Sequence, residues 1–132
     1  MSEPRNTVAQ ALAGAATLGV ERLDTQLLLL HALGRASGER AWLLAHDGDT
    51  LAPEVGDRFQ KLLVRRLAGE PVAYLLGEKE FHGLALQVDA RVLVPRPDTE
   101  TLVDWAIERL QGLREVRVID LGSGSGAIAL AL

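Results

Sequence analysis

The sequence predicts an α + α/β fold, with a small N-terminal helical bundle, a β-hairpin linker and the beginning of an α/β domain. Residues 1–76 show apolar residues at helical spacing, interrupted by Gly, Ser and Pro, and no alternating strand pattern. Alternating apolar residues appear only after Gly77. Residues 118–132, VIDLGSGSGAIALAL, place a glycine-rich loop between a short apolar run and a second helical pattern. We therefore divide the chain into residues 1–76, 77–97 and 98–132.

The composition is that of a folded protein without redox or membrane features. Of its 132 residues, 48% are hydrophobic and 24% are charged, and the net charge is −4. This mild acidity gives no reason to expect a nucleic acid partner, because phosphate binding normally needs a basic surface. The chain has no cysteine, which suits a reducing compartment, and no apolar run of the roughly 20 residues that a membrane span needs. We expect a soluble, cytoplasmic protein.

Five helical segments are expected before Gly77. Asp24 and Ser37 are candidate N-caps of the second and third segments, because Asp and Ser side chains accept hydrogen bonds from free helix N–H groups. Pro53 suits the first position of the fourth segment, where its missing N–H costs nothing. The expected helices cover residues 7–18, 25–33, 38–46, 53 to about 69, and 71–76.

The pattern after Gly77 predicts a hairpin, a helix and a strand. Residues 84–88 and 92–94 alternate in hydrophobicity, and a turn near Asp89 would join them as two strands. Asp98 or Thr99 is expected to cap a helix that ends at residue 110. The apolar face of this helix would contain Leu102, Val103, Ala106, Ile107 and Leu110. Residues 116–121 are expected to form a short buried strand that leads into the glycine loop.

The glycine loop is the strongest candidate binding site. Glycines permit a tight turn and let a ligand lie against bare peptide groups, and the following helix N-terminus offers free N–H groups to an anion. The proposed binding residues are Asp120, Gly122, Ser123, Gly124, Ser125 and Gly126.

Several ligand classes are consistent with such a loop. A P-loop is excluded because it needs a lysine, and no lysine follows Lys79. A dinucleotide fingerprint could use Gly122, Gly124 and Ala127, but its ribose-binding acid would lie about 20 residues further on, beyond this chain. S-adenosylmethionine is a further candidate ligand. Its ammonium group could bind to Asp120, and its carboxylate could bind to loop N–H groups. A turn that binds nothing is the remaining alternative.

Three stretches of the sequence closely resemble the release-factor glutamine methyltransferase family. In chain order they are GEPVAYLLGEKEF at 69–81, VLVPRPDTETLV at 92–103 and the glycine loop at 118–132. The resemblance covers nearly the whole chain. It implies a helical domain that recognises the protein substrate, a hairpin linker, and the start of a class I, Rossmann-like methyltransferase domain. It also implies S-adenosylmethionine as cofactor.

The reaction that this resemblance implies is methylation of the glutamine side chain in the Gly-Gly-Gln motif of class 1 peptide-chain release factors. The Asn-Pro-Pro-Tyr motif with which the family grips that amide is absent from these residues. The catalytic residues are therefore unknown, and we expect the chain alone to be an inactive N-terminal fragment. Three alternatives stay open: a ribosomal-protein glutamine methyltransferase, a helical binding module without catalysis, and a nicotinamide-dependent oxidoreductase.

Several other polar residues could have either a structural or a functional role. His31, His46 and His82 are expected at the surface or at helix caps rather than around a metal. A solvated helix face is the expected role of Lys61, Arg65 and Arg66, with contact to an acidic patch of a protein substrate as the alternative.

The two tryptophans and the segment PRPDTE also have predicted roles. Trp42 and Trp105 are expected in the core, because each has apolar neighbours at helical spacing. Arg96 and Glu100 could line a cofactor or substrate cleft, or the prolines around them could simply fix a bend. Ser123 and Ser125 are expected to be loop spacers, since no neighbouring base would activate them.

Overall fold

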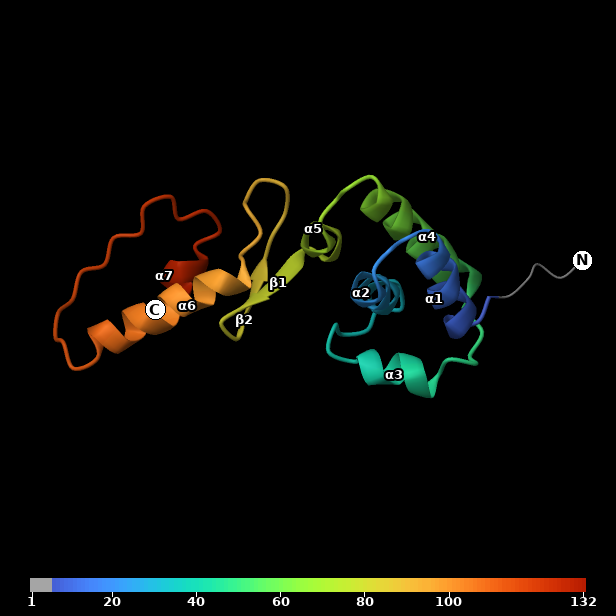
Figure 1. The fold of residues 1–132 in the computed structure, drawn as a ribbon, viewed down its shortest axis with the longest axis horizontal. Coiled ribbons are helices and arrows are strands. Elements are labelled where there is room, and N and C mark those ends of the chain that lie inside the picture. Colours follow the sequence, from blue (N-terminus) through green and yellow to red (C-terminus); the bar gives the residue numbers. More distant parts are fainter. Residues whose placement is uncertain (1–5) are drawn as a thin grey trace, which may run out of the picture. The chain divides into compact units, whose positions relative to one another are not determined.

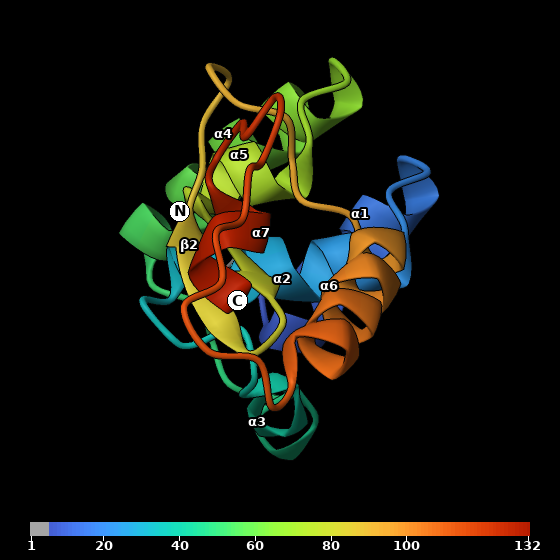
Figure 2. The same ribbon diagram turned by 90° about the vertical axis from the view of Figure 1, so that its left-hand side faces the viewer.

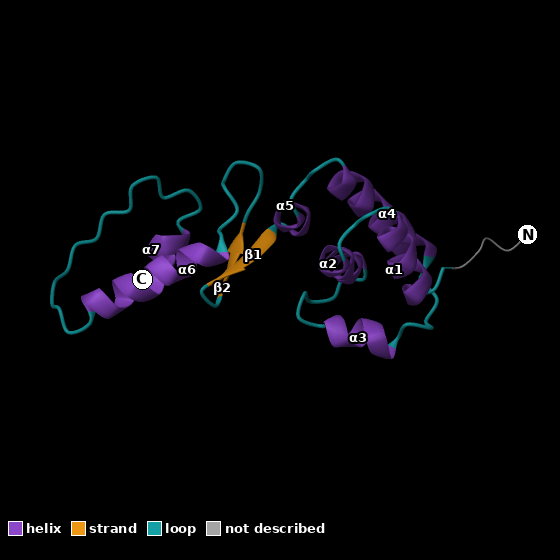
Figure 3. Cartoon of the chain, viewed as in Figure 1, coloured by secondary structure: helices purple, strands orange, loops and turns teal. Residues whose placement is uncertain are grey.

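The chain forms two compact units, residues 1–76 (unit 1) and 77–132 (unit 2), in the computed structural model, which describes residues 6–132. Unit 1 is helical, whereas unit 2 contains a two-stranded sheet and two helices (Figures 1 and 3). No helix within residues 6–132 is both long and apolar enough to cross a lipid bilayer.

The described part of unit 1, residues 6–76, contains five helices, close to the five predicted segments. They are α1 (Val8–Thr17), α2 (Arg22–Ala32), α3 (Arg40–Ala45), α4 (Pro53–Leu67) and α5 (Val72–Leu76). Thr7 and Gln10 form a capping box at the start of α1, in which each side chain accepts a hydrogen bond from the other residue's backbone N–H, at 3.2 and 2.9 Å. Pro53 is the first residue of α4, as predicted.

Two predicted N-caps are wrong. Helix α2 begins at Arg22, so Asp24 lies inside its first turn, where its carboxylate accepts from the guanidinium of Arg66 at 2.9 Å instead of from a helix N–H. Helix α3 begins at Arg40 and leaves Ser37 outside the helix. At Asp24, a contact with a residue far along the chain therefore replaces the local cap that the sequence suggested.

Helix α2 forms the centre of unit 1. Leu28, Leu29 and Leu30 are each 0% exposed, and α2 contacts α1, α3, α4 and α5. Phe59 and Leu63 of α4 belong to the same core. Backbone hydrogen bonds also tie the start of α1 to the segment before α4, including one from the Leu51 N–H to the Asn6 carbonyl at 2.9 Å.

The hairpin of unit 2 lies earlier in the chain than predicted. Strands β1 (Glu78–Phe81) and β2 (Leu84–Gln87) pair antiparallel, with Phe81 opposite Leu84. The turn is His82-Gly83, and both residues have positive φ (49° and 77°), as a tight hairpin turn requires. Residues 92–94 form no strand and the predicted turn at Asp89 does not join two strands. The alternating pattern located one true strand but paired it with the wrong partner.

Helix α6 (Pro97–Leu110) begins at the residue after Arg96, so neither Asp98 nor Thr99 is its cap. Its apolar face is only partly covered, because Val103 is buried while Leu102 is half exposed. Trp105 is 55% exposed, which contradicts its predicted core position, and the Arg109 guanidinium lies 5.4 Å from the centre of its ring. In unit 1, Trp42 is partly buried against the core, as predicted.

Residues 116–121 form no strand, contrary to the prediction. Ile119 and Leu121 are 82% and 89% exposed. A strand of a parallel sheet needs at least one neighbouring strand to pair its backbone groups, and the described residues supply none here. The chain then turns into the short helix α7 (Ala127–Ala131), which contacts α6 (Figure 2).

Replacing Leu29 by alanine should destabilise unit 1 by about 2–5 kcal/mol, because it removes a fully buried leucine from the central helix. Urea unfolding followed by circular dichroism measures this loss. Leu44→Ala is the matched control, since Leu44 is 65% exposed and should change the free energy of unfolding by less than about 0.5 kcal/mol. Equal effects of the two variants would contradict the assigned core.

Candidate functional site

The predicted binding residues form one continuous glycine-rich turn before α7. Gly122, Gly124 and Gly126 have φ of 70°, 55° and 80°, and the Gly126 N–H donates to the Ser123 carbonyl at 2.8 Å. These positive φ values are costly for residues with a Cβ. Local backbone conformation therefore explains why glycine alternates with serine here.

Open space lies over the loop glycines. A Cβ placed on Gly122 or Gly124 would meet no heavy atom within 4 Å, and one on Gly126 would meet only the Leu130 Cδ1 atom, at 3.9 Å. The glycines are thus not needed for packing inside the protein. The bare peptide groups remain accessible to a ligand from that side.

Asp120 precedes the loop and carries an unpaired acceptor. Its Oδ2 atom is buried and has no hydrogen-bond partner within residues 6–132. A buried acceptor without a partner costs about 1–3 kcal/mol, so a donor that approaches it gains that energy back. The arrangement suits a cationic or N–H-bearing ligand group.

Glu100 and His82 connect α6 to the hairpin. The Glu100 Oε1 atom accepts from the His82 backbone N–H at 2.8 Å, and the His82 Nε2 atom lies 2.7 Å from the Asp104 Oδ1 atom. Both contacts hold the hairpin turn, in which His82 takes its positive φ. The Glu100 side chain therefore helps to hold the hairpin turn in place. Arg96 is exposed before the first residue of α6.

The three histidines lie in different surroundings. His31 is exposed on α2, His46 stacks on Trp42 with ring centres 4.1 Å apart, and His82 contacts Asp104. Among the described residues, no three His, Asp or Glu side chains are grouped closely enough to hold a metal ion.

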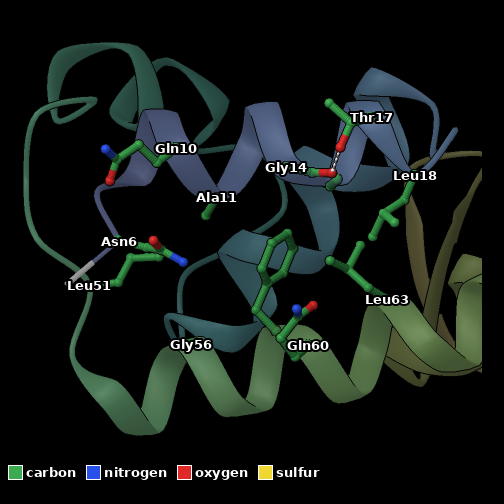
Figure 4. Close-up of a pocket in the computed structure, with 12 residues that line it drawn as sticks. Asn6, Gln10, Ala11, Gly14, Thr17, Leu18, Leu51, Gly56, Gln60 and Leu63 are labelled. Carbon is green, nitrogen blue, oxygen red and sulfur yellow. Dashed lines mark hydrogen bonds between the residues drawn. The ribbon is translucent and has the colours of Figure 1, made fainter. Parts of the chain in front are cut away.

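A cavity of about 210 Å³ lies between α1 and α4 (Figure 4). Small residues, Gly14 on α1 and Gly56 on α4, leave this space between the helices. The hydroxyl of Thr17 donates to the Gly14 carbonyl at 2.7 Å, and Gln10 is engaged in the capping box of α1. Two of the polar residues that line the cavity, Gln10 and Thr17, therefore make contacts that stabilise α1.

Comparison with known proteins identifies the family. The family model described as the PrmC N-terminal domain matches residues 5–77, more than half of the chain. A release factor glutamine methyltransferase of Bordetella pertussis is 52% identical over 114 residues, which are 86% of this chain and 41% of that relative. The relatives of the same name in Xylella fastidiosa (strain 9a5c) and Escherichia coli (strain K12) are 49% and 46% identical, over 92% and 84% of this chain and 43% and 39% of their own lengths.

These similarities place the chain in a family whose named members are methyltransferases. It belongs to the release factor glutamine methyltransferase family and contains the family's N-terminal domain. The chain spans about two fifths of the length of the curated relatives that it matches.

The linker after the hairpin contains an ion pair that should be visible in a titration. The Arg91 side chain and backbone N–H donate to the Asp89 carboxylate, with the side-chain Nε atom 2.9 Å from Oδ1, and they lower the pKa of Asp89 from 3.8 to about 2. Because the folded pKa is lowered, the stabilisation is complete above pH 3.8 and is lost as the pH falls towards about 2. Carboxyl ¹³C NMR should therefore show a midpoint near pH 2 for Asp89.

Arg91→Ala should move this midpoint towards 3.8, the ordinary pKa of the carboxyl group. Arg114→Ala removes an exposed arginine elsewhere in unit 2 and should leave the titration of Asp89 unchanged. If Arg91→Ala leaves the titration midpoint of Asp89 unchanged, the ion pair does not form in solution.

Proposed function

We propose that this chain is the N-terminal part of an S-adenosylmethionine-dependent enzyme that methylates the Gly-Gly-Gln glutamine of class 1 peptide-chain release factors in the cytoplasm. The observation that carries the proposal is the open glycine loop that follows an unpaired carboxylate oxygen of Asp120. The names of the relatives support the substrate.

The loop residues fit the amino acid part of this cofactor. The Asp120 Oδ2 atom would accept from the ammonium group, and N–H groups of Gly122 and Gly124 would face the carboxylate. Ser123 and Ser125 would add hydroxyl groups. When bound, the cofactor supplies a methyl group on a sulfonium.

The exposed segment 116–121 supports a Rossmann-like start for unit 2. Val118, Ile119 and Leu121 would be buried if further strands paired beside them, and this parallel sheet would fix Asp120 at a strand end. Such strands would have to come from residues other than these 132. The loop itself needs only the local conformation that the structure already has.

Unit 1 would hold the protein substrate. An amide nitrogen is a poor nucleophile, so the enzyme must work mainly by positioning the glutamine side chain against the sulfonium methyl. Contacts far from the reacting atoms can supply the binding energy for that positioning. A helical domain with its own core is suited to this task.

The 132-residue chain alone should transfer no methyl group to a release factor, because it lacks the amide-gripping motif that the resemblance implies. Incubation with radiolabelled S-adenosylmethionine and a purified release factor tests this directly. The Bordetella pertussis relative is the positive control. Turnover by the chain alone would contradict the proposal that it is an inactive fragment.

A chimaera in which residues 1–132 are followed by the remainder of the Bordetella pertussis relative should methylate release factors. In this chimaera Asp120→Asn should weaken S-adenosylmethionine binding roughly tenfold to hundredfold, since a charge-assisted hydrogen bond contributes about 1.5–3 kcal/mol. Isothermal titration calorimetry measures the affinity.

Glu115→Gln is the control for the loss of a negative charge, because Glu115 is exposed and lies outside the loop. It should leave cofactor affinity unchanged. Methylation of a ribosomal protein but not of release factors would favour the ribosomal-protein alternative. Heat of binding with reduced nicotinamide dinucleotide, and none with the methyl donor, would overturn the assigned cofactor.

A further inference from the structure

A cavity on the surface of unit 1 is surrounded by basic side chains. It has a volume of about 290 Å³ and lies between the end of α2 and the middle of α4. We call it the basic pocket. Its lining residues are His31 and Ala32 of α2, and Arg58, Lys61, Leu62 and Arg65 of α4.

The rim of the basic pocket contains two cations without a salt bridge among residues 6–132. Arg65 is paired with Glu70, through its Nε and Nη2 atoms at 2.9 and 2.7 Å. Arg58 and Lys61 are exposed and form no salt bridge with any of residues 6–132. No Asp or Glu among these residues lines the cavity. A concentration of positive charge thus occurs in a chain whose net charge is −4.

The polar side chains around the pocket differ from those that the sequence grouped together. The sequence grouped Lys61 and Arg65 with Arg66, but Arg66 is turned towards Asp24 on α2 and does not line the pocket. Arg58 and His31 take its place around the cavity. The spacing of Arg58 from Lys61 and Arg65 on α4 could have predicted that Arg58 belongs to this group. His31 comes from a different helix, so that spacing could not predict it.

The spacing of these cations along α4 places like charges next to one another, although Glu54 and Asp57 stand one turn before Arg58 and Lys61. Arg58, Lys61 and Arg65 stand at positions i, i+3 and i+7 of the helix, so their side chains lie on one face. Like charges one turn apart on a helix repel and destabilise it by a few tenths of a kcal/mol. Binding of an anionic partner would remove that repulsion.

The base of the basic pocket favours a peptide over a bare phosphate. Ala32 is buried and Leu62 is half buried, so the cavity combines an apolar base with a cationic rim. An aliphatic side chain flanked by carboxylates matches both parts of the surface.

We propose that the basic pocket binds an acidic, amphipathic segment of a protein partner, with an aliphatic side chain over Ala32 and Leu62 and carboxylates beside Arg58 and Lys61. This inference deepens the proposed function and rests on it for the partner being the protein substrate. Every residue involved lies in unit 1, so the binding can be measured without cofactor or methyl transfer.

The test uses the 132-residue chain and a synthetic helical peptide that carries glutamates one turn apart beside a leucine. NMR should show shifts of the Ala32 and Leu62 methyl groups on titration, and raising the salt concentration should weaken the binding. A peptide with glutamine in place of each glutamate is the matched probe and should bind more weakly.

The double variant Arg58→Glu, Lys61→Glu should weaken binding of the acidic peptide roughly tenfold, because two exposed attractions become repulsions. Arg40→Glu, an exposed arginine on α3 outside the pocket, is the control and should leave the affinity within about twofold. Arg58→Gln, Lys61→Gln removes charge without reversing it and should have an intermediate effect, and circular dichroism shows whether each variant is folded.

Three outcomes would overturn the proposal. They are equal affinity for the acidic and glutamine peptides, equal losses with Arg40→Glu and the double variant, and tighter binding of inorganic phosphate or a short RNA than of the acidic peptide. None of these outcomes depends on the chimaera assay. A chimaera without methyltransferase activity but with an intact acidic peptide site would instead contradict the proposed function.

Discussion

The complete burial of three consecutive leucines on α2 determines how unit 1 is built. Successive residues of a helix lie about 100° apart, so Leu28, Leu29 and Leu30 face more than half of its circumference. No single neighbour can cover such an arc, and α2 is accordingly in contact with α1, α3, α4 and α5. Near the start of α2, Asp24 pairs with Arg66, and near its end His31 lines the basic pocket.

Unit 2 is organised by backbone conformation more than by burial. Phe81 and Val103 are fully covered, yet Ile119 and Leu121 are almost fully exposed. The glycine loop nevertheless has its positive φ values, because these depend on the glycines themselves and not on a surrounding sheet. Its conformation is therefore encoded locally, whereas the cofactor pocket that we propose around it needs strands beyond this chain.

The sequence predicted the features that depend on local pattern and missed those that depend on distant partners. Helix α4 was predicted because Pro53 and the apolar spacing that follows it lie within one segment. The cap at Asp24 was wrong because Arg66 lies 42 residues away. The hairpin was misplaced because a positive φ at His82, stabilised by Glu100, leaves no mark in the alternation of apolar residues. The loop glycines were identified from their spacing alone.

The two proposals assign different tasks to the two units. Transfer to a poor nucleophile requires the substrate amide to be held in one orientation, and the energy for this can come from contacts remote from the reacting atoms. Arg58 and Lys61 would supply such contacts through charge, and the apolar base of the pocket would add direction by accepting one aliphatic side chain. A long-range attraction combined with a shaped contact selects a particular segment of a protein, which neither could do alone.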